Sequence, residues 1–260
     1  MNFGIEGKRA LVCGASRGIG FSCAEMLAAE GANLVLVARG AERLEQAAEE
    51  LRSRFDVDVE TLAVDLSGTE GRQHVIANCG AVDILIHNGG WPVADRDFRE
   101  WTHDEWMAAI DAMMMAPIEL ITGVVDGMIE RRFGRIVAIT SRFVKEPTLR
   151  LSQSVGSRLG LTGFMVGLSK EVAPYNVTVN TTLPGIIETE TQVEFGHRLA
   201  AAASKTFEEI WHEREQTNSA KRFGTPEEFA SLCVYLCSRQ AGFITGQNIV
   251  CDGGGYPGVL

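Results

Sequence analysis

A glycine-rich turn between an apolar run and an amphipathic helix pattern constrains the fold of this chain more than any other feature. Residues 10–12 are typical of a short buried strand, and the turn at residues 13–20 contains Gly14, Gly18 and Gly20. Behind the turn, one helical face collects Ile19, Cys23, Met26 and Leu27. The N-terminus of a helix leaves backbone N–H groups unpaired, and its dipole favours negative charge. The stretch therefore predicts an anion site, where small residues let a pyrophosphate approach the main chain.

The spacing Gly-x-x-x-Gly-x-Gly is weak evidence by itself, so the rest of the chain decides its meaning. Strand and helix patterns alternate from end to end. Strands are expected at residues 10–12, 33–38, 57–64, 82–86, 135–140, 177–181 and 247–251. Helices are expected after the turn, at residues 41–54, 71–79, 101–115, 117–132 and 152–173, within 189–217, and from Pro226. This alternation predicts right-handed βαβ units and a parallel sheet covered on both faces, the doubly wound α/β class.

Unusual residue clusters fall where the expected strands end. They are residues 14–20, Arg39, Asp65, residues 87–90, Ser141 and residues 184–189. In doubly wound sheets the ligand lies at the carboxyl ends of the strands, near the point where the strand order reverses. The agreement between clusters and strand ends strengthens the interpretation of the glycine turn as a phosphate site.

Length and composition exclude several classes of protein. The chain of 260 residues is long enough for one sizeable core and predicts a single domain over residues 1–260. A net charge of −10 argues against a nucleic-acid surface. We expect no secretory signal, no apolar run long enough to span a bilayer, and six scattered cysteines that stay reduced. These features predict a cytoplasmic protein that acts on a small molecule, without a metal, a nucleic acid or a membrane as partner.

Ordered motifs run through nearly the whole chain. They are GASRGIG at residues 14–20, HNGG at 87–90, GRIV at 134–137 before Ser141, VTVN at 177–180, PG at 184–185 with Thr189, RFGTPEE at 222–228, and DGG at 252–254. With these motifs the chain resembles the short-chain dehydrogenase/reductase family, and most of all its β-ketoacyl-acyl-carrier-protein reductase-like branch. The resemblance implies one Rossmann-like domain with a seven-stranded parallel sheet, a nicotinamide cofactor and a homotetramer.

The resemblance also assigns a cofactor site. It implies that Gly14, Ala15, Ser16, Arg17, Gly18, Ile19 and Gly20 hold the pyrophosphate, that Asp65 and Leu66 lie near the adenine, and that Asn88, Gly89 and Gly90 follow the middle of the cofactor. It places Pro184, Gly185, Ile187 and Thr189 beside the nicotinamide. Arg39 follows the second strand, where a carboxylate would favour NAD and a guanidinium suits a 2′-phosphate. With Arg17 as a second cation, we expect NADP(H) to be preferred over NAD(H); the alternative is that Arg39 is a solvated residue at the start of a helix.

The catalytic pattern of the family is incomplete in this sequence. The family uses an Asn–Ser–Tyr–Lys set, in which Tyr gives a proton to the substrate. Alignment from Ser141 and from Asn180 puts Ser154 at the Tyr position, Arg158 at the Lys position and Met113 at the Asn position. A hydroxyl is a poorer acid than a phenol, and a guanidinium keeps its proton at neutral pH. Ser141, Ser154 and Arg158 are therefore expected to donate hydrogen bonds to a developing oxyanion.

Three interpretations stay open. The first is an NADP(H)-dependent oxidoreductase acting on a 3-oxoacyl-like or other small ketone at the Ser141, Ser154 and Arg158 site. The second is a non-redox lyase or dehalogenase-like enzyme in the same pocket. The third is a cofactor-binding pseudoenzyme with a sensing or assembly role. Around the site we expect residues 189–217 to form a substrate lid, Trp91, Pro92 and Trp101 to form an apolar wall, and His87 to be structural.

Overall fold

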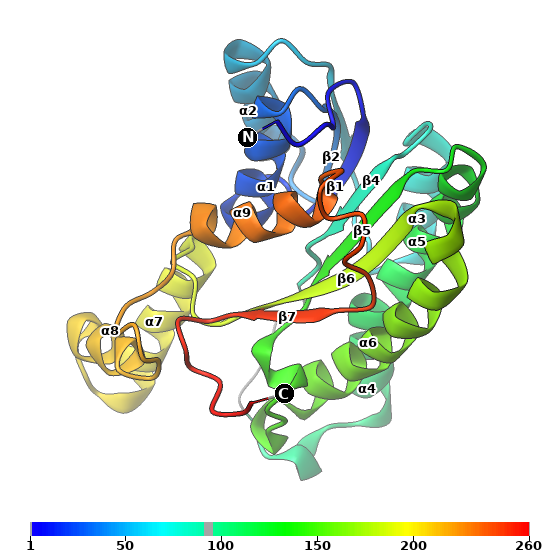
Figure 1. Cartoon of the computed structure of the whole chain (residues 1–260). Coiled ribbons are helices and arrows are strands. Elements are labelled where there is room, and N and C mark those ends of the chain that lie inside the picture. The colour runs from blue at the N-terminus through cyan, green and yellow to red at the C-terminus, as the bar shows by residue number, and fades with distance from the viewer. Residues whose placement is uncertain (1, 91–95, 260) are drawn as a thin grey trace.

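Seven parallel strands form the centre of the protein (Figure 1). The computed structural model describes residues 2–90 and 96–259. The sheet order is β3-β2-β1-β4-β5-β6-β7, and every pairing is parallel. The strands are β1 (Arg9–Cys13), β2 (Asn33–Ala38), β3 (Val59–Ala63), β4 (Ile84–His87), β5 (Gly134–Ile139), β6 (Val177–Pro184) and β7 (Asn248–Cys251). The predicted doubly wound α/β class and the seven-stranded parallel sheet are confirmed.

Helices cover both faces of the sheet, because side chains along each buried strand alternate between two apolar clusters. Ala10 and Val12 of β1 face the cluster built with α1 (Gly18–Ala29), α2 (Ala41–Arg54) and α9 (Pro226–Cys237). Leu11 and Cys13 face the cluster built with α3 (Thr69–Asn78), α5 (Ala116–Glu130) and α6 (Ser152–Val172). The sheet therefore has two cores, one under each layer of helices (Figure 1).

Two further helices lie beyond the carboxyl end of β6. They are α7 (Glu190–Ala203) and α8 (Phe207–Glu215), which project together from the sheet (Figure 1). The helical segment expected at residues 189–217 is thus two helices, because Ser204 takes a left-handed conformation with φ 55° and ends α7. Phe207 stacks between His197 of α7 and Trp211 of α8, which ties the two helices into one unit.

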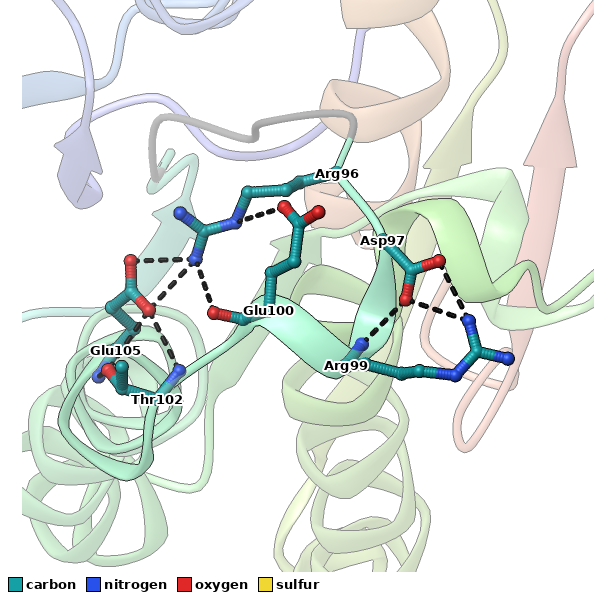
Figure 2. Close-up of polar contacts among 6 residues, drawn as sticks. All are labelled: Arg96, Asp97, Arg99, Glu100, Thr102 and Glu105. Atoms are coloured by element: carbon teal, nitrogen blue, oxygen red, sulfur yellow. Dashed lines mark hydrogen bonds and ion pairs between the residues drawn. The ribbon is translucent and has the colours of Figure 1, made fainter.

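The segment before α4 (His103–Ile110) is fixed by charge pairing (Figure 2). Arg96 donates to both carboxylate oxygens of Glu105 at 2.8 Å, and its guanidinium lies 3.8 Å from the centre of the Trp101 ring. Glu105 and Thr102 form a capping box at the start of α4. Trp101 is therefore stacked under a cation. The rest of the expected apolar wall, Trp91 and Pro92, lies outside the described residues.

The expected helix over residues 101–115 changes its winding near its end. Residues Asp111–Met115 form a turn of π-helix between α4 and α5, and Met113 in this turn is buried. Such insertions are frequent at functional sites. The turn lies against α6, where Met114 packs within 2.7 Å of the position that a Cβ on Gly160 would occupy. Helical periodicity in the sequence gave no sign of this change.

One helical stretch of the described residues reaches the length needed to span a bilayer. Residues 103–130 pass this test by length and composition, with a mean hydropathy of 1.6 in the most apolar window. The expectation that no apolar run has this length is therefore corrected. In the fold 44% of that window is buried, and Leu120, Ile121 and Met128 belong to the core. Packing of one face against the sheet accounts for its apolar residues.

Replacing Gly20 with Ala is expected to destabilise the fold. A Cβ on Gly20 would lie 2.1 Å from the carbonyl oxygen of Gly14, so the turn must shift to accommodate it. We expect the free energy of unfolding to fall by about 1–3 kcal/mol in urea titrations. The matched control is Gly163→Ala at an exposed position of α6, where nothing lies within 4 Å of the new methyl group. Helix propensity predicts a gain of up to about 1 kcal/mol there. Equal stability of the two variants would contradict this account.

Candidate functional site

The glycine turn contacts the end of β4 directly. Gly14 has φ +67°, and a Cβ on it would lie 2.3 Å from the backbone oxygen of Asn88. The Asn88 amide nitrogen lies 3.1 Å from the Cβ position of Gly14 and also of Gly20. Ala15 is fully buried and donates its N–H to the oxygen of Val37 at 3.2 Å. The structure therefore brings Gly14, Gly20 and Asn88 together, and only glycine fits both turn positions.

The opposite wall of this edge comes from the segment after β6. Gly18 has φ +56°, and its Cβ position lies 3.2 Å from the Thr189 methyl group. Thr189 is the N-cap of α7 and accepts a hydrogen bond from Gln192. Gly185 donates its N–H to the oxygen of Cys251 and leaves no room for a side chain beside Asp252. Ile187 is buried in the core, 4% exposed, so its contribution to the wall is its backbone.

Arginines gather at the carboxyl ends of β1 and β2. Arg39 is exposed directly after β2 and makes no hydrogen bond or ion pair with the described residues. Asp65 lies near it; the Ser67 amide donates to this carboxylate and, with Arg39, keeps the pKa of Asp65 below its usual value. Arg17 is not free: it donates to Glu190 at 2.9 Å and to Glu194 at 3.3 Å. The sequence did not indicate these two partners.

The neighbouring Asp65–Leu66 segment is held from behind by a buried arginine. The Arg72 side chain is 1% exposed and donates to the backbone oxygens of Leu66 and Ser67 at 3.1 and 3.0 Å. It also pairs with Asp111 and Glu119 on the π turn and α5. Arg72 thus links the expected adenine end of the site to the helix that carries Met113.

Ser154 and Arg158 meet at the carboxyl end of β5. Both lie on one face of α6, four residues apart, and the Arg158 Nε donates to the Ser154 Oγ at 3.2 Å. The Arg158 Nη1 donates to the backbone oxygens of Ile139 and Thr140 at 3.3 and 2.8 Å. Its Nη2 has no hydrogen-bond partner among the described residues. Ser154 and Arg158 thus contact each other, and Arg158 reaches the carbonyl oxygen of Thr140, the residue directly before Ser141.

Arg158 is a largely buried cation without a carboxylate. No ion pair is formed by it in the described part of the chain, and burial lowers its pKa to about 10. That value still leaves the guanidinium charged at neutral pH. Burial and the nearby Arg158 charge lower the pKa of His87 to about 4, so the imidazole is neutral. A buried, uncompensated cation is costly and favours an anion or an oxyanion beside it.

Ser141 is not part of the hydrogen-bonded pair of Ser154 and Arg158. Its Oγ accepts from the Phe143 amide at 3.3 Å, at the start of the short 3₁₀ turn Arg142–Val144, and no hydrogen bond joins it to Ser154 or Arg158 in the described residues. Ser141 follows Thr140, the residue whose carbonyl oxygen holds Arg158, so the chain keeps all three residues at one strand end. Met113, at the expected Asn position, is apolar and buried and offers no hydrogen bond.

Several buried polar atoms at this edge lack a hydrogen-bond partner. They lie at the carboxyl ends of β4 and β5 and in the first two turns of α6: His87 Nε2, Thr140 Oγ1, Gln153 Nε2 and Ser157 Oγ. Native proteins rarely leave such atoms unpaired. The N-terminus of α6, which has no side-chain cap, adds its unpaired N–H groups. Together with the glycine turn, these groups fit an elongated polar ligand along the edge. His87 was expected to be a hydrogen-bonded structural residue, and the missing partner of its Nε2 among the described residues is a feature that the sequence did not predict.

An α/β sheet with a glycine turn at the strand-order reversal defines a Rossmann-type dinucleotide-binding protein. Residues 8–200 match the model of the short chain dehydrogenase family. The chain belongs to this family of oxidoreductases, and the resemblance to its β-ketoacyl-acyl-carrier-protein reductase-like members is confirmed. One relative is the 3-oxoacyl-(acyl-carrier-protein) reductase FabG of Aquifex aeolicus, 31% identical over 258 residues that cover 98% of this chain and 99% of the relative.

One further relative and one solved structure are similar to this chain and have names that state an activity. The NADPH-dependent reductase BacG of Bacillus subtilis is 31% identical over 254 residues, which cover 95% of this chain and 97% of BacG. The structure of L-sorbose reductase from Gluconobacter frateurii, complexed with NADPH and L-sorbose, superposes with a TM-score of 0.94 at 32% identity. That match covers 100% of both chains. The chain thus shares its fold and family with proteins that are described as reductases.

Replacing Arg158 with Met is expected to leave the fold as stable as before, or to stabilise it. The change removes a desolvated charge that has no ion-pair partner among the described residues, and this gain is expected to offset the loss of the hydrogen bonds to the oxygens of Ile139 and Thr140. The matched comparison is Arg135→Met: Arg135 is 1% exposed and donates to the oxygens of Gly134, Asn176 and Ser238 inside the fold. We expect that variant to lose about 2–5 kcal/mol. Thermal unfolding measures both, and a lower melting temperature for Arg158→Met than for Arg135→Met would make Arg158 a structural residue.

Proposed function

We propose that this protein is an NADP(H)-dependent carbonyl reductase whose oxyanion site consists of Ser141, Ser154 and Arg158. The observation that carries the proposal is the Arg158 guanidinium, which is charged, forms no ion pair with the described residues and donates to Ser154 at the carboxyl end of β5. The similarity to the NADPH-dependent reductase BacG and to L-sorbose reductase, whose structure contains NADPH and L-sorbose, supports the reaction class. The substrate class is a 3-oxoacyl-like compound or another small ketone.

The residues present fit a nicotinamide dinucleotide. Gly14, Gly18 and Gly20 let the turn pack closely against Asn88 and Thr189, and the N-terminus of α1, which has no side-chain cap, offers unpaired N–H groups to a phosphate. We assign Arg39 and Arg17 to the 2′-phosphate, Asp65 and Leu66 to the adenine end, and Asn88, Gly89 and Gly90 to the middle. Pro184, Gly185, Ile187 and Thr189 are assigned to the nicotinamide end. When bound, the cofactor supplies or accepts the hydride.

The chain's own contribution is to stabilise charge on the substrate oxygen. Arg158 Nη2 is unoccupied by the described residues and donates to an oxyanion placed beside it. Ser154 accepts the hydrogen bond of Arg158 Nε, so its own hydroxyl hydrogen is free to be donated to the same oxygen. In this arrangement a guanidinium that stays charged at neutral pH takes the place of the phenol, and Ser154 passes a proton that solvent replaces.

We also propose a homotetramer in the cytoplasm with α7 and α8 as the substrate lid. Large apolar side chains stay exposed around α4 and α6: Phe98, Met107, Leu149 and Leu159, each 40–65% exposed. Two of them, Phe98 and Leu149, line a cavity of about 470 Å³ together with Trp106 and Val155. A face of this kind favours burial against another subunit. All six cysteines are free, as a reducing compartment requires. Analytical ultracentrifugation measures the assembly state.

Transfer of deuterium is the direct test of the reaction class. The protein is incubated with NADPH deuterated at the transferable position and a mixed pool of ketones. We expect deuterium in one alcohol product, identified by mass spectrometry. Product without deuterium would favour the non-redox lyase or dehalogenase-like alternative. Tight NADPH binding without any product would favour a cofactor-binding pseudoenzyme.

The pH profile distinguishes the proposed role of Arg158. Only the charged guanidinium stabilises an oxyanion, so kcat/KM is expected to stay level above neutrality and to fall as the pH rises through about 10. Arg158→Lys starts from a lower ordinary pKa and is lowered further by the same burial, so its alkaline limb is expected at lower pH. Arg158→Met is expected to lose about 100-fold or more in kcat/KM. An unchanged alkaline limb in Arg158→Lys would show that another group titrates.

A further inference from the structure

Two arginines from different elements bind one carboxylate beside the glycine turn. Arg17 precedes α1, Arg43 lies in the first turn of α2, and Glu190 is the first residue of α7. The Arg17 Nη1 lies 2.9 Å from the Glu190 Oε2, and the Arg43 Nη2 contacts the Oε1. Each carboxylate oxygen therefore takes one guanidinium. Arg17 also reaches Glu194, one turn further along α7, at 3.3 Å.

This ion-pair cluster, which we name the Glu190 clamp, spans the opening of the cofactor edge. One partner belongs to the glycine turn and the other to the helix that follows Thr189. The same two segments touch where the Cβ position of Gly18 lies 3.2 Å from Thr189. The clamp therefore holds α7 against the turn at the place where a phosphate must enter.

The ion pairs of the Glu190 clamp are weak enough for another anion to replace the carboxylate. The side chains of Arg17, Arg43 and Glu190 are 37%, 46% and 55% exposed, and ion pairs at such exposure contribute little to stability and are screened by salt. A phosphate group carries more charge than a carboxylate and presents three oxygens to guanidinium forks. It is therefore the better ligand for the same two arginines. Arg39, exposed nearby and without an ion pair in the described residues, adds a third cation.

We propose that Glu190 is a displaceable stand-in for the 2′-phosphate of the cofactor, and that Arg43 is a specificity-determining residue that receives this phosphate together with Arg17 and Arg39. The inference rests on the proposed use of NADP(H). A dinucleotide with the 2′-phosphate takes the guanidiniums from Glu190 and releases α7 from the turn. A dinucleotide without it has no group that competes with the carboxylate, so the clamp opposes its entry.

The test compares dissociation constants for NADPH and NADH in the wild-type protein and in three variants. They are Glu190→Gln, Arg43→Gln and the control Glu213→Gln. Glu213 is 54% exposed and pairs with Lys205 at 2.6 Å within the α7–α8 unit, so the control removes a similar carboxylate from the same unit, away from the turn. Calorimetry is carried out at low and at high salt, with melting temperatures as a check of folding.

We expect Glu190→Gln to bind NADPH about three- to tenfold more tightly than the wild type, because the competing carboxylate is gone. Arg43→Gln is expected to bind NADPH about five- to twentyfold more weakly, and NADH no more weakly than the wild type, because the variant also weakens the clamp that opposes NADH. Both effects shrink at high salt. Glu213→Gln is expected to match the wild type for both nucleotides.

Different results overturn different statements. Wild-type protein that binds neither nucleotide, or binds NADH more tightly than NADPH, overturns the proposed function and with it the clamp. Wild-type protein that prefers NADPH, with Glu190→Gln binding it no more tightly than Glu213→Gln does, overturns the exchange alone. Equal losses for NADPH and NADH in Arg43→Gln show that Arg43 only supports the fold. Hydrogen exchange at residues 190–193 gives a second readout: NADPH is expected to raise exchange there in the wild type, and NADH is not.

Discussion

The site depends on the parallel pairing of β1 with β2 on one side and with β4 on the other. In this register Val12 of β1 lies opposite Leu36 and Ile86. All carboxyl ends therefore meet at one edge, and the strand order reverses between β1 and β4. The glycine turn after β1 and Asn88 after β4 contact each other because of this register. A slip of one residue would turn every side chain of a strand to the opposite face and separate the two segments.

This dependence explains which parts of the structure were predictable. Buried parallel strands tend to be apolar throughout, so β1, β2, β4 and β5 could be recognised as runs, and the turn glycines mark places where no Cβ fits. The sixth strand, predicted at residues 177–181, extends to Pro184, because it continues through Thr181 and Thr182, which are polar but buried. The third strand was predicted too long, at residues 57–64. In the structure it covers Val59–Ala63 and lies at the edge of the sheet, where it pairs only with β2. Edge strands have weaker apolar patterns, so their ends are poorly marked.

The side-chain partners in the site could not be predicted, because they join segments far apart in the chain. The position of Ser154 and Arg158 on one face follows from helical spacing, yet their contact with the carbonyl oxygens of Ile139 and Thr140 needs the packing of α6 against the sheet. Glu190 pairs with arginines 173 and 147 residues earlier, a separation that no local pattern reports. The π turn at Met113 likewise depends on the packing of neighbouring helices rather than on local sequence.

Charge ties the two ends of the site together. The chain carries a net charge of −10, so an anionic cofactor approaches against a repulsive field and needs local cations to bind. At the phosphate end those cations are exposed, and Glu190 neutralises two of them until a stronger anion arrives. At the reacting end Arg158 has no such carboxylate among the described residues, and its partial burial weakens the screening of its charge by water. An exposed cation exchanges its partner cheaply, whereas a buried cation gains most from an oxyanion that forms only during the reaction. The same residue type thus serves binding at one end and charge stabilisation at the other, and the difference lies in burial.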